Sequence, residues 1–325
     1  RVVELRKRLL VTADLEAYIP EDERTFDTKL EQGVKEFQRR HGLIVDGLVG
    51  KNISKALNVS VDQRIDQIRV NLERARWVLR NLPPEFIIIN IAGFTVFLVK
   101  NGESVWRSKV VVGKTYRKTP VFKAEMMYID FNPTWTVPPI ILRNDILPEV
   151  KKDPVYLQKK RIRVLSKTGQ EIPQDTINWS RYSALNFPYI LRQDPGPDNG
   201  LGVVKFMFPN KHFVFLHDTP SKSLFEKDIR TFSSGCIRVQ NPLELAELLL
   251  SDQEYWNREA IEKVVAWGKT KTVHLKKPIP VLVLYWTSRV DQEGKVQFLP
   301  DVYNRDQEVL RELDAEFKVR KRDVQ

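Results

Sequence analysis

Cys236 and His217 are the two residues of this sequence whose types and spacing point most directly to chemistry. Cys236 is the single cysteine among 325 residues, and it follows Ser233, Ser234 and Gly235 in a polar turn. His217 lies nineteen residues upstream, at the end of the alternating run KHFVFLH. A thiol is a strong nucleophile only as a thiolate, and a nearby imidazole is the usual group that removes its proton.

Gly235 strengthens this interpretation of the thiol. A glycine lets the backbone approach a substrate closely, so the amides of Gly235 and Cys236 would face a developing oxyanion. A lone cysteine is more often a small buried side chain, and a lone histidine near a strand end is more often structural. A polar SSGC turn that leads into a strand is a poor place to bury an inert thiol. We therefore predict a nucleophile and base pair.

Two segments around this pair resemble a known family. Segments 217–219 (HDT) and 233–239 (SSGCIRV) are similar to the signature of the YkuD-type L,D-transpeptidase catalytic domain. Many relatives have HG where this chain has HD, and SHGC where it has SSGC. The nucleophile and base positions are the same. The resemblance implies a mostly β-sandwich catalytic domain, within an α+β chain.

The resemblance also implies an activity. Such an enzyme cuts a peptidoglycan tetrapeptide stem after its third residue, a diaminopimelate or similar diamino acid. Cys236 would attack the carbonyl of that L-centre and release the terminal D-alanine. The thioester would then pass to the side-chain amine of a neighbouring stem, giving a 3→3 cross-link. His217 would take the thiol proton and serve the leaving and attacking amines.

Partners and location follow from the same resemblance. The partners are peptidoglycan stem peptides, donor and acceptor, with cell-wall synthesis proteins as further candidates. Carbapenems are expected to acylate the thiol. The expected location is the periplasm, with an anchor to the inner membrane in a segment before Arg1. We expect neither a cofactor nor a metal.

Four more residues are candidates for substrate binding. Arg238 shares a strand face with Cys236 if the strand begins there. It could hold a stem carboxylate, lower the thiol pKa, or pair with a surface acid. Ser234 lies in the nucleophile turn, and Asn199 lies where the chain returns to the sheet. Trp135 offers a large apolar face for packing over a bound stem.

Composition narrows the classes of partner. Lys and Arg exceed Asp and Glu, for a net charge of +11, which suits nucleic acid, anionic lipid or a carboxylate-rich polymer. The sequence has no helix-turn-helix, zinc-finger or RNP signature, which argues against nucleic acid. It also has no HExxH, no paired cysteines and no phosphate-binding glycine loop. Stem peptides carry several carboxylates, which would match the excess of positive charge.

Residues 1–60 are predicted to form a compact three-helix module. Asp27 can cap the second helix, and Gly42 can end it. The order FQRRHGLIVDGLVG…ISKAL is similar to a small peptidoglycan-binding domain. We interpret His41 as a charge at a helix end. Apolar residues recur at helical spacing on the first two helices, at Val2, Leu5, Leu9 and Leu10, then at Leu30, Val34 and Phe37.

Residues 61–82 predict a connecting helix that packs on a neighbour, because apolar residues recur four and three positions apart. Pro83-Pro84 ends it. The catalytic domain is expected over 83–310, beginning with strands joined by a hairpin at Asn101-Gly102. Residues 311–325 read as a charged tail. The apolar stripe consists of Val61, Ile65, Ile68, Leu72, Ala75, Leu79 and Leu82.

Residues 133–201 interrupt the strand pattern with a dense run of prolines. We predict an irregular insert that caps the active-site cleft as a lid. A surface subdomain without a role in catalysis is the alternative.

Three rival functions share these features. An L,D-carboxypeptidase needs only water as the acceptor. A Cys-His endopeptidase usually places its cysteine before its histidine, whereas this chain has the reverse order. A wall-binding scaffold without activity would use residues 1–60 and not Cys236. The sequence does not indicate the oligomeric state or the preferred acceptor.

Overall fold

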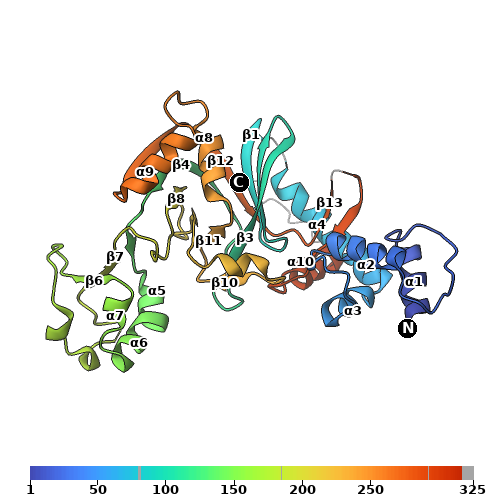
Figure 1. Cartoon of the computed structure of the whole chain (residues 1–325), viewed down its shortest axis with the longest axis horizontal. Coiled ribbons are helices and arrows are strands. Elements are labelled where there is room, and N and C mark those ends of the chain that lie inside the picture. The colour runs from blue at the N-terminus through green and yellow to red at the C-terminus, as the bar shows by residue number, and fades with distance from the viewer. Residues whose placement is uncertain (80–81, 184, 292, 317–325) are drawn as a thin grey trace, which may run out of the picture.

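The computed structural model describes residues 1–79, 82–183, 185–291 and 293–316. The chain forms three parts in a row (Figure 1). The helical N-terminal module lies at one end, the catalytic sheet lies in the middle, and the proline-rich insert lies at the other end.

The N-terminal module has the three predicted helices, α1 (Val2–Val11), α2 (Thr28–Arg40) and α3 (Lys51–Leu57). The Asp27 side chain accepts a hydrogen bond from the Leu30 amide, which confirms the predicted cap. Gly42 has a φ of +65°, a conformation in which glycine avoids the strain of a side chain. The predicted core is confirmed except at Leu10, which is exposed. Its buried members are Leu9, Leu30, Val34, Phe37 and Ile53.

Helix α4 (Val61–Val78) confirms the predicted connecting helix, but the predicted packing face is wrong. The side that is buried carries Val70, Asn71 and Arg74. Asn71 on this side hydrogen-bonds with Thr287, and Arg74 with Asp306 and the Arg305 carbonyl, so the surface that it meets requires donors and acceptors rather than methyl groups. The members of the apolar stripe that are instead exposed are Val61, Ile65, Leu72 and Leu79.

The catalytic domain is built on one nine-stranded mixed sheet in the order β10-β3-β11-β9-β8-β4-β12-β1-β2. Strand β2 also pairs with β3, so the sheet closes on itself around the main apolar core. This confirms the predicted α+β class with a largely β catalytic domain. The strands are β1 (Glu85–Asn90), β2 (Thr95–Lys100), β3 (Glu103–Gly113), β4 (Phe122–Phe131), β8 (Val204–Met207), β9 (Leu216–His217), β10 (Thr231–Ser233), β11 (Ile237–Val239) and β12 (Lys271–Leu284).

The hairpin between β2 and β3 confirms the prediction at Asn101-Gly102, since both residues have positive φ, 51° and 85°. Helices α8 (Pro242–Leu250) and α9 (Arg258–Trp267) contribute apolar residues to the main core. The chain then forms the hairpin β13 (Ser288–Val290) and β14 (Val296–Phe298), and helix α10 (Asp306–Asp314). Of the predicted tail, residues 317–325 lie outside the described residues.

The prediction that the insert is irregular is wrong. Residues 133–201 have an apolar core of their own, which includes Leu157, Val164 and Leu191. Pro139 occupies the first turn of a helix, where no amide is needed. Pro148 follows a π-helical turn directly and the helical run continues past it to Lys152, so neither proline prevents helix formation. The elements are β5 (Trp135–Thr136), α5 (Pro139–Ile141), the π-helical turn η1 (Leu142–Ile146), α6 (Leu147–Lys152), α7 (Tyr156–Lys159), β6 (Ile162–Leu165), the short 3₁₀ helices η2 (Gln174–Thr176) and η3 (Trp179–Arg181), and β7 (Ile190–Gln193).

Candidate active site

The register of three neighbouring strands places the candidate residues on one face of the sheet. His217 on β9 is opposite Arg238 on β11 and opposite Lys205 on β8. Residues directly opposite each other in a sheet share a face, so these three side chains form a row. Cys236 precedes Arg238 by two positions and therefore lies on the same side. The intervening Ile237 is buried in the core on the other side.

The turn before the nucleophile is held by hydrogen bonds from both sides. Gly235 has a φ of +119°, which glycine adopts without strain. Its amide donates to Ser233 Oγ at 3.1 Å, and its carbonyl accepts from Thr119 Oγ1 at 2.8 Å. The Gly235 amide is therefore occupied, and its predicted place in an oxyanion hole is not supported. The Cys236 amide has no acceptor among the described residues and stays a candidate.

His217 is almost fully buried, and its tautomer is fixed by the backbone. Nδ1 lies 2.5 Å from the carbonyl oxygen of Asp218. Because a carbonyl only accepts hydrogen bonds, Nδ1 carries the proton and Nε2 of the neutral ring is left unprotonated. The Leu201 backbone also interacts with the ring. The carboxylate of Asp218 is used elsewhere, by the Val203 amide at 3.0 Å and by Lys222. The backbone of Asp218, and not its side chain, thus orients the imidazole.

Burial and two cations set the protonation of the pair. Burial, with help from Arg238 and Lys205, lowers the pKa of His217 to about 3. Burial also raises the pKa of the half-buried Cys236 thiol, although the Phe215 backbone and the same two cations act in the opposite direction. At neutral pH the thiol and the imidazole are therefore both neutral, and the thiol donates to the Phe213 carbonyl at 3.8 Å. Such an imidazole can act as a general base during attack.

Arg238 and Ser234 both lie at this site, with different surroundings. Arg238 is half-buried, and its Nε is buried without a hydrogen-bond partner among the described residues. Ser234 Oγ accepts a hydrogen bond from Arg117 at 2.8 Å. Arg117 also makes two hydrogen bonds to Asp145 of the insert, at 2.6 and 3.2 Å. The nucleophile turn is thus joined to the insert through one guanidinium.

Trp135 and Asn199 lie at the base of the insert instead. Asn199 is 1% exposed. Its amide nitrogen donates to the carbonyls of Pro133 and Asp194, and its oxygen accepts from the Leu201 amide. Trp135 packs half-buried against the core of the insert. The structure therefore gives Asn199 a supporting role, and a binding role for Trp135 stays a prediction.

Four residues that shape the site were missed by sequence reasoning. Lys205 is one of them, although its position inside the apolar strand VVKFMFP was a usable signal. The others come from distant segments, and no local pattern marks them. Thr119 donates to the Gly235 carbonyl, and Arg117 donates to Ser234. Tyr303 donates to the carbonyl of Gly113, whose amide donates to Thr119.

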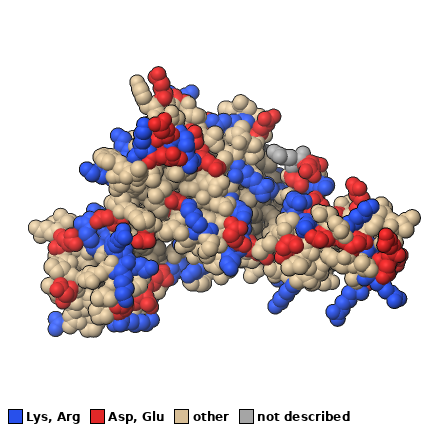
Figure 2. Space-filling view, in the orientation of Figure 1, with Lys and Arg blue, Asp and Glu red and all other residues tan. Residues whose placement is uncertain are grey.

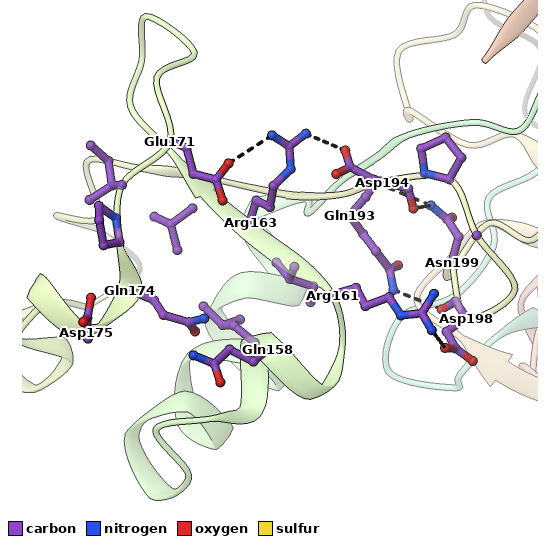
Figure 3. A pocket seen from close by; sticks show the side chains of 17 residues that line it. Gln158, Arg161, Arg163, Glu171, Gln174, Asp175, Gln193, Asp194, Asp198 and Asn199 are labelled. Carbon is purple, nitrogen blue, oxygen red and sulfur yellow. Dashed lines mark hydrogen bonds and ion pairs between the residues drawn. The ribbon is translucent and has the colours of Figure 1, made fainter. Parts of the chain in front are cut away.

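Two sizeable cavities lie away from Cys236. One, of about 480 Å³, is within the insert. Figure 3 shows that its arginines face carboxylates: Arg163 lies 2.6 Å from Asp194, and Arg161 lies 3.6 Å from Asp198. The other, of about 790 Å³, lies between the N-terminal module and the catalytic domain and is lined by residues of both. Neither contains the thiol, and the charges of the first are largely paired with one another.

Charged residues are mixed on the face of the molecule shown in Figure 2. On the face shown in Figure 2, acidic and basic residues of the described chain are interspersed over all three parts, without a continuous basic track. The described residues contain no group of three His, Cys, Asp or Glu placed to hold a metal ion. Of the described helices, none has the length and apolar character needed to cross a bilayer.

Comparison with known proteins gives two family matches. Residues 84–280 match the family "L,D-transpeptidase catalytic domain", which is more than half of the chain. Residues 1–57 match the family "Putative peptidoglycan binding domain". A protein of Haemophilus influenzae named "Putative L,D-transpeptidase" is 31% identical over 246 residues, which cover 75% of this chain and 48% of that protein. The chain thus spans about half the length of this curated relative.

Solved structures of similar proteins align only loosely. An L,D-transpeptidase from Stackebrandtia nassauensis is 14% identical, with 87% of this chain and 89% of that chain covered and a TM-score of 0.31. L,D-transpeptidase 3 from Mycobacterium tuberculosis, with a faropenem-derived adduct, is 12% identical, with 62% and 60% covered and a TM-score of 0.29.

Proposed function

The chain belongs to the L,D-transpeptidase family, and from this premise we propose that it is a cysteine-dependent acyltransferase that forms 3→3 cross-links in peptidoglycan. The observation that carries the proposal is the common sheet face of Cys236 and His217, with the His217 tautomer fixed by the Asp218 carbonyl. With Nδ1 protonated, Nε2 is the nitrogen of the neutral ring that can accept the thiol proton.

The proposed first half-reaction makes a thioester. His217 Nε2 takes the thiol proton as Cys236 Sγ bonds to the carbonyl carbon of the third stem residue. The Cys236 amide stabilises the oxyanion that forms. The carbon–nitrogen bond to the terminal D-alanine then breaks, and His217 returns the proton to the departing nitrogen. This leaves an acyl-enzyme and free D-alanine.

The second half-reaction uses an amine of a neighbouring stem. His217 takes a proton from this amine as the nitrogen attacks the thioester carbon. The carbon–sulfur bond breaks, and the proton passes to the thiolate, which restores the starting enzyme. Arg238 can hold a stem carboxylate, and the peptidoglycan-binding family match supports wall binding by residues 1–57. A periplasmic location is part of this proposal because the substrate lies there.

Carbapenem acylation of Cys236 is a further part of the proposal. The relative from Mycobacterium tuberculosis carries a faropenem-derived adduct, and another similar protein was solved with imipenem. A strained lactam presents an activated carbonyl to the same thiol, so one adduct per chain is expected.

Mass spectrometry of purified disaccharide-tetrapeptide after incubation with the protein tests this function. A dimer linked 3→3 is expected with the wild-type chain and no change with Cys236→Ala. Tripeptide alone would instead assign an L,D-carboxypeptidase. An unchanged substrate with an intact, alkylatable Cys236 would overturn the proposal in favour of a binding scaffold.

A further inference from the structure

Lys205 is an unusual lysine. It lies in the short strand β8, and its side chain is only 18% exposed. Its nearest carboxylate among the described residues is Asp130, opposite it on β4, at 3.9 Å. This is an ion-pair distance but not a hydrogen bond, and the ammonium donates no hydrogen bond to any described residue. The ammonium thus has no hydrogen-bond acceptor among the described residues, and it is not among the fully buried atoms, so a ligand can reach it from solvent.

Arg238, on the other side of His217, also lacks hydrogen-bond acceptors among the described residues. Its side chain makes no hydrogen bond or ion pair with the described residues, and its Nε is buried without a partner. Leaving buried donors unsatisfied costs free energy, and the cost is higher for charged groups. Two cations of this kind on one face are what a site for an anion requires, since the ligand supplies the missing acceptors.

The row Lys205–His217–Arg238 also has a suitable span. Neighbouring strands lie about 4.8 Å apart, so the backbones of Lys205 and Arg238 are separated by about 10 Å across β9. Two long side chains can close that distance around a single carboxylate. Phe215 limits the direction that Lys205 can take, because the ammonium lies 4.7 Å from the centre of its ring.

The position of His217 between the cations identifies which carboxylate fits. In the proposed reaction His217 returns a proton to the nitrogen of the departing residue, so that residue must lie over the imidazole. Its carboxylate is attached to the carbon bonded to this nitrogen. The carboxylate of the departing residue therefore falls beside His217, where Lys205 and Arg238 have free donors.

We propose that Lys205 and Arg238 together bind the terminal carboxylate of the departing residue, so that the enzyme selects stems that end one residue after the cleaved bond. This inference rests on the proposed function. It extends it by making Lys205 a specificity-determining residue. A longer stem, in which that carboxylate is an amide, loses both charge-assisted hydrogen bonds.

The test compares two donors that differ only at this group, disaccharide-tetrapeptide and the same molecule with a C-terminal carboxamide. With wild-type enzyme, kcat/KM should be about 10- to 100-fold lower for the carboxamide. In Lys205→Met, kcat/KM for the acid should fall by a similar factor while the carboxamide changes little. Lys205→Arg should restore most of the discrimination. Lys211→Met, which removes an exposed charge from a nearby loop, should leave both donors unchanged.

A role for Lys205 that is confined to the thiol or to the fold would give a different pattern. Lys205→Met would then lower kcat/KM for both donors equally, and the proposal would be wrong. Equal use of acid and carboxamide by the wild-type enzyme would also overturn it. Alkylation of Cys236 by uncharged iodoacetamide reports the state of the thiol in each variant independently of any carboxylate.

A binding measurement separates this inference from the proposed function. In a Cys236→Ala background, calorimetry should show tighter binding of the acid than of the carboxamide, with the difference lost in Cys236→Ala/Lys205→Met. A chain that binds the acid selectively but forms no product would keep the carboxylate site and reject the transpeptidase. A chain that turns over both donors alike would keep the transpeptidase function and reject the carboxylate site.

Discussion

The N-terminal module and the proline-rich insert are both attached to the same catalytic sheet, but in different ways. The module and its connecting helix α4 dock through polar contacts at several places, and α4 supplies the two contacts given next. Gln67 donates to the carbonyls of Thr287 and Leu299 at 2.7 and 2.9 Å, and Arg74 lies 2.6 Å from Asp306. The insert has a separate core, and within the described residues it reaches the nucleophile turn through the guanidinium of Arg117.

The difference suggests different roles. The module also holds the segment between His217 and Cys236, since Asp228 accepts from the Ile44 amide at 2.6 Å and from Asn52 at 3.1 Å. A part that is fixed at so many points acts as a support for the catalytic segment, in addition to any wall binding. The insert, joined at its base and at Arg117, has a core of its own and, in the described part of the chain, fewer polar contacts of this kind. Its action as a lid stays a prediction.

Breaking the attachment of helix α4, which connects the module to the catalytic domain, should give the largest loss of stability. In Arg74→Met the Asp306 carboxylate loses its cation. The loss is costly because the two side chains are only 7% and 20% exposed. We expect the free energy of unfolding in urea to fall by about 3–5 kcal/mol. Arg69→Met is the matched control on the same helix, because its pairs with Asp66 and Asp314 are exposed and worth about 0–1 kcal/mol. Equal losses in both variants would refute the buried attachment.

Breaking the contact of the insert should instead affect activity more than stability. Arg117→Met frees Ser234 and Asp145, so the nucleophile turn loses one of its supports. We expect kcat/KM on tetrapeptide to fall about 10- to 100-fold, with a stability loss of about 1–2 kcal/mol. Arg163→Met, which breaks ion pairs inside the insert only, should leave kcat/KM within about twofold. If the two variants behave alike, the contact through Arg117 has no special role.

His41, where the module contacts the catalytic domain, should have a smaller effect, on the pH dependence of the unfolding free energy. His41 is buried against Phe37, and burial lowers its pKa to about 3. The folded chain keeps the ring neutral while the unfolded chain takes up a proton below about pH 6.5, so acid favours unfolding. Between pH 6.5 and 3, His41→Gln should reduce the slope of the unfolding free energy by about 1.4 kcal/mol per pH unit relative to wild type. An unchanged slope would show that His41 titrates normally.

This histidine also marks a limit of sequence reasoning. A charge at a helix end is the interpretation that the sequence favours, because His41 follows two arginines. The structure buries it as a neutral ring between Phe37 and Phe298, since β14 packs on the module from more than 250 residues away. The same long-range docking exposes Leu72 and buries Arg74 on α4. The spacing of apolar residues predicts which face of a helix is apolar, but it does not predict which part of the protein packs against that face.

The catalytic segment could be predicted because its features are local in the sequence. Cys236, Gly235 and the alternation around His217 are local features, and strand register then fixes which side chains share a face. Lys205 pairs with His217 on the next strand, and its place inside an apolar strand was a usable signal. Thr119 lies in a loop and reaches the Gly235 carbonyl from more than 100 residues away, so no local signal places it near the thiol. The prediction of an irregular insert is wrong because a proline at a helix start and a proline in a loop look the same in a sequence.

The most direct test of the central claim, that Cys236 is acylated with His217 as the base, is intact-protein mass spectrometry during turnover of tetrapeptide. The wild-type chain should gain the mass of the tripeptide acyl group on the peptide that contains Cys236, and Cys236→Ala should gain none. In His217→Gln the adduct should form about 10²- to 10⁴-fold more slowly. An adduct in Cys236→Ala, or an unchanged rate in His217→Gln, would contradict this account of the site.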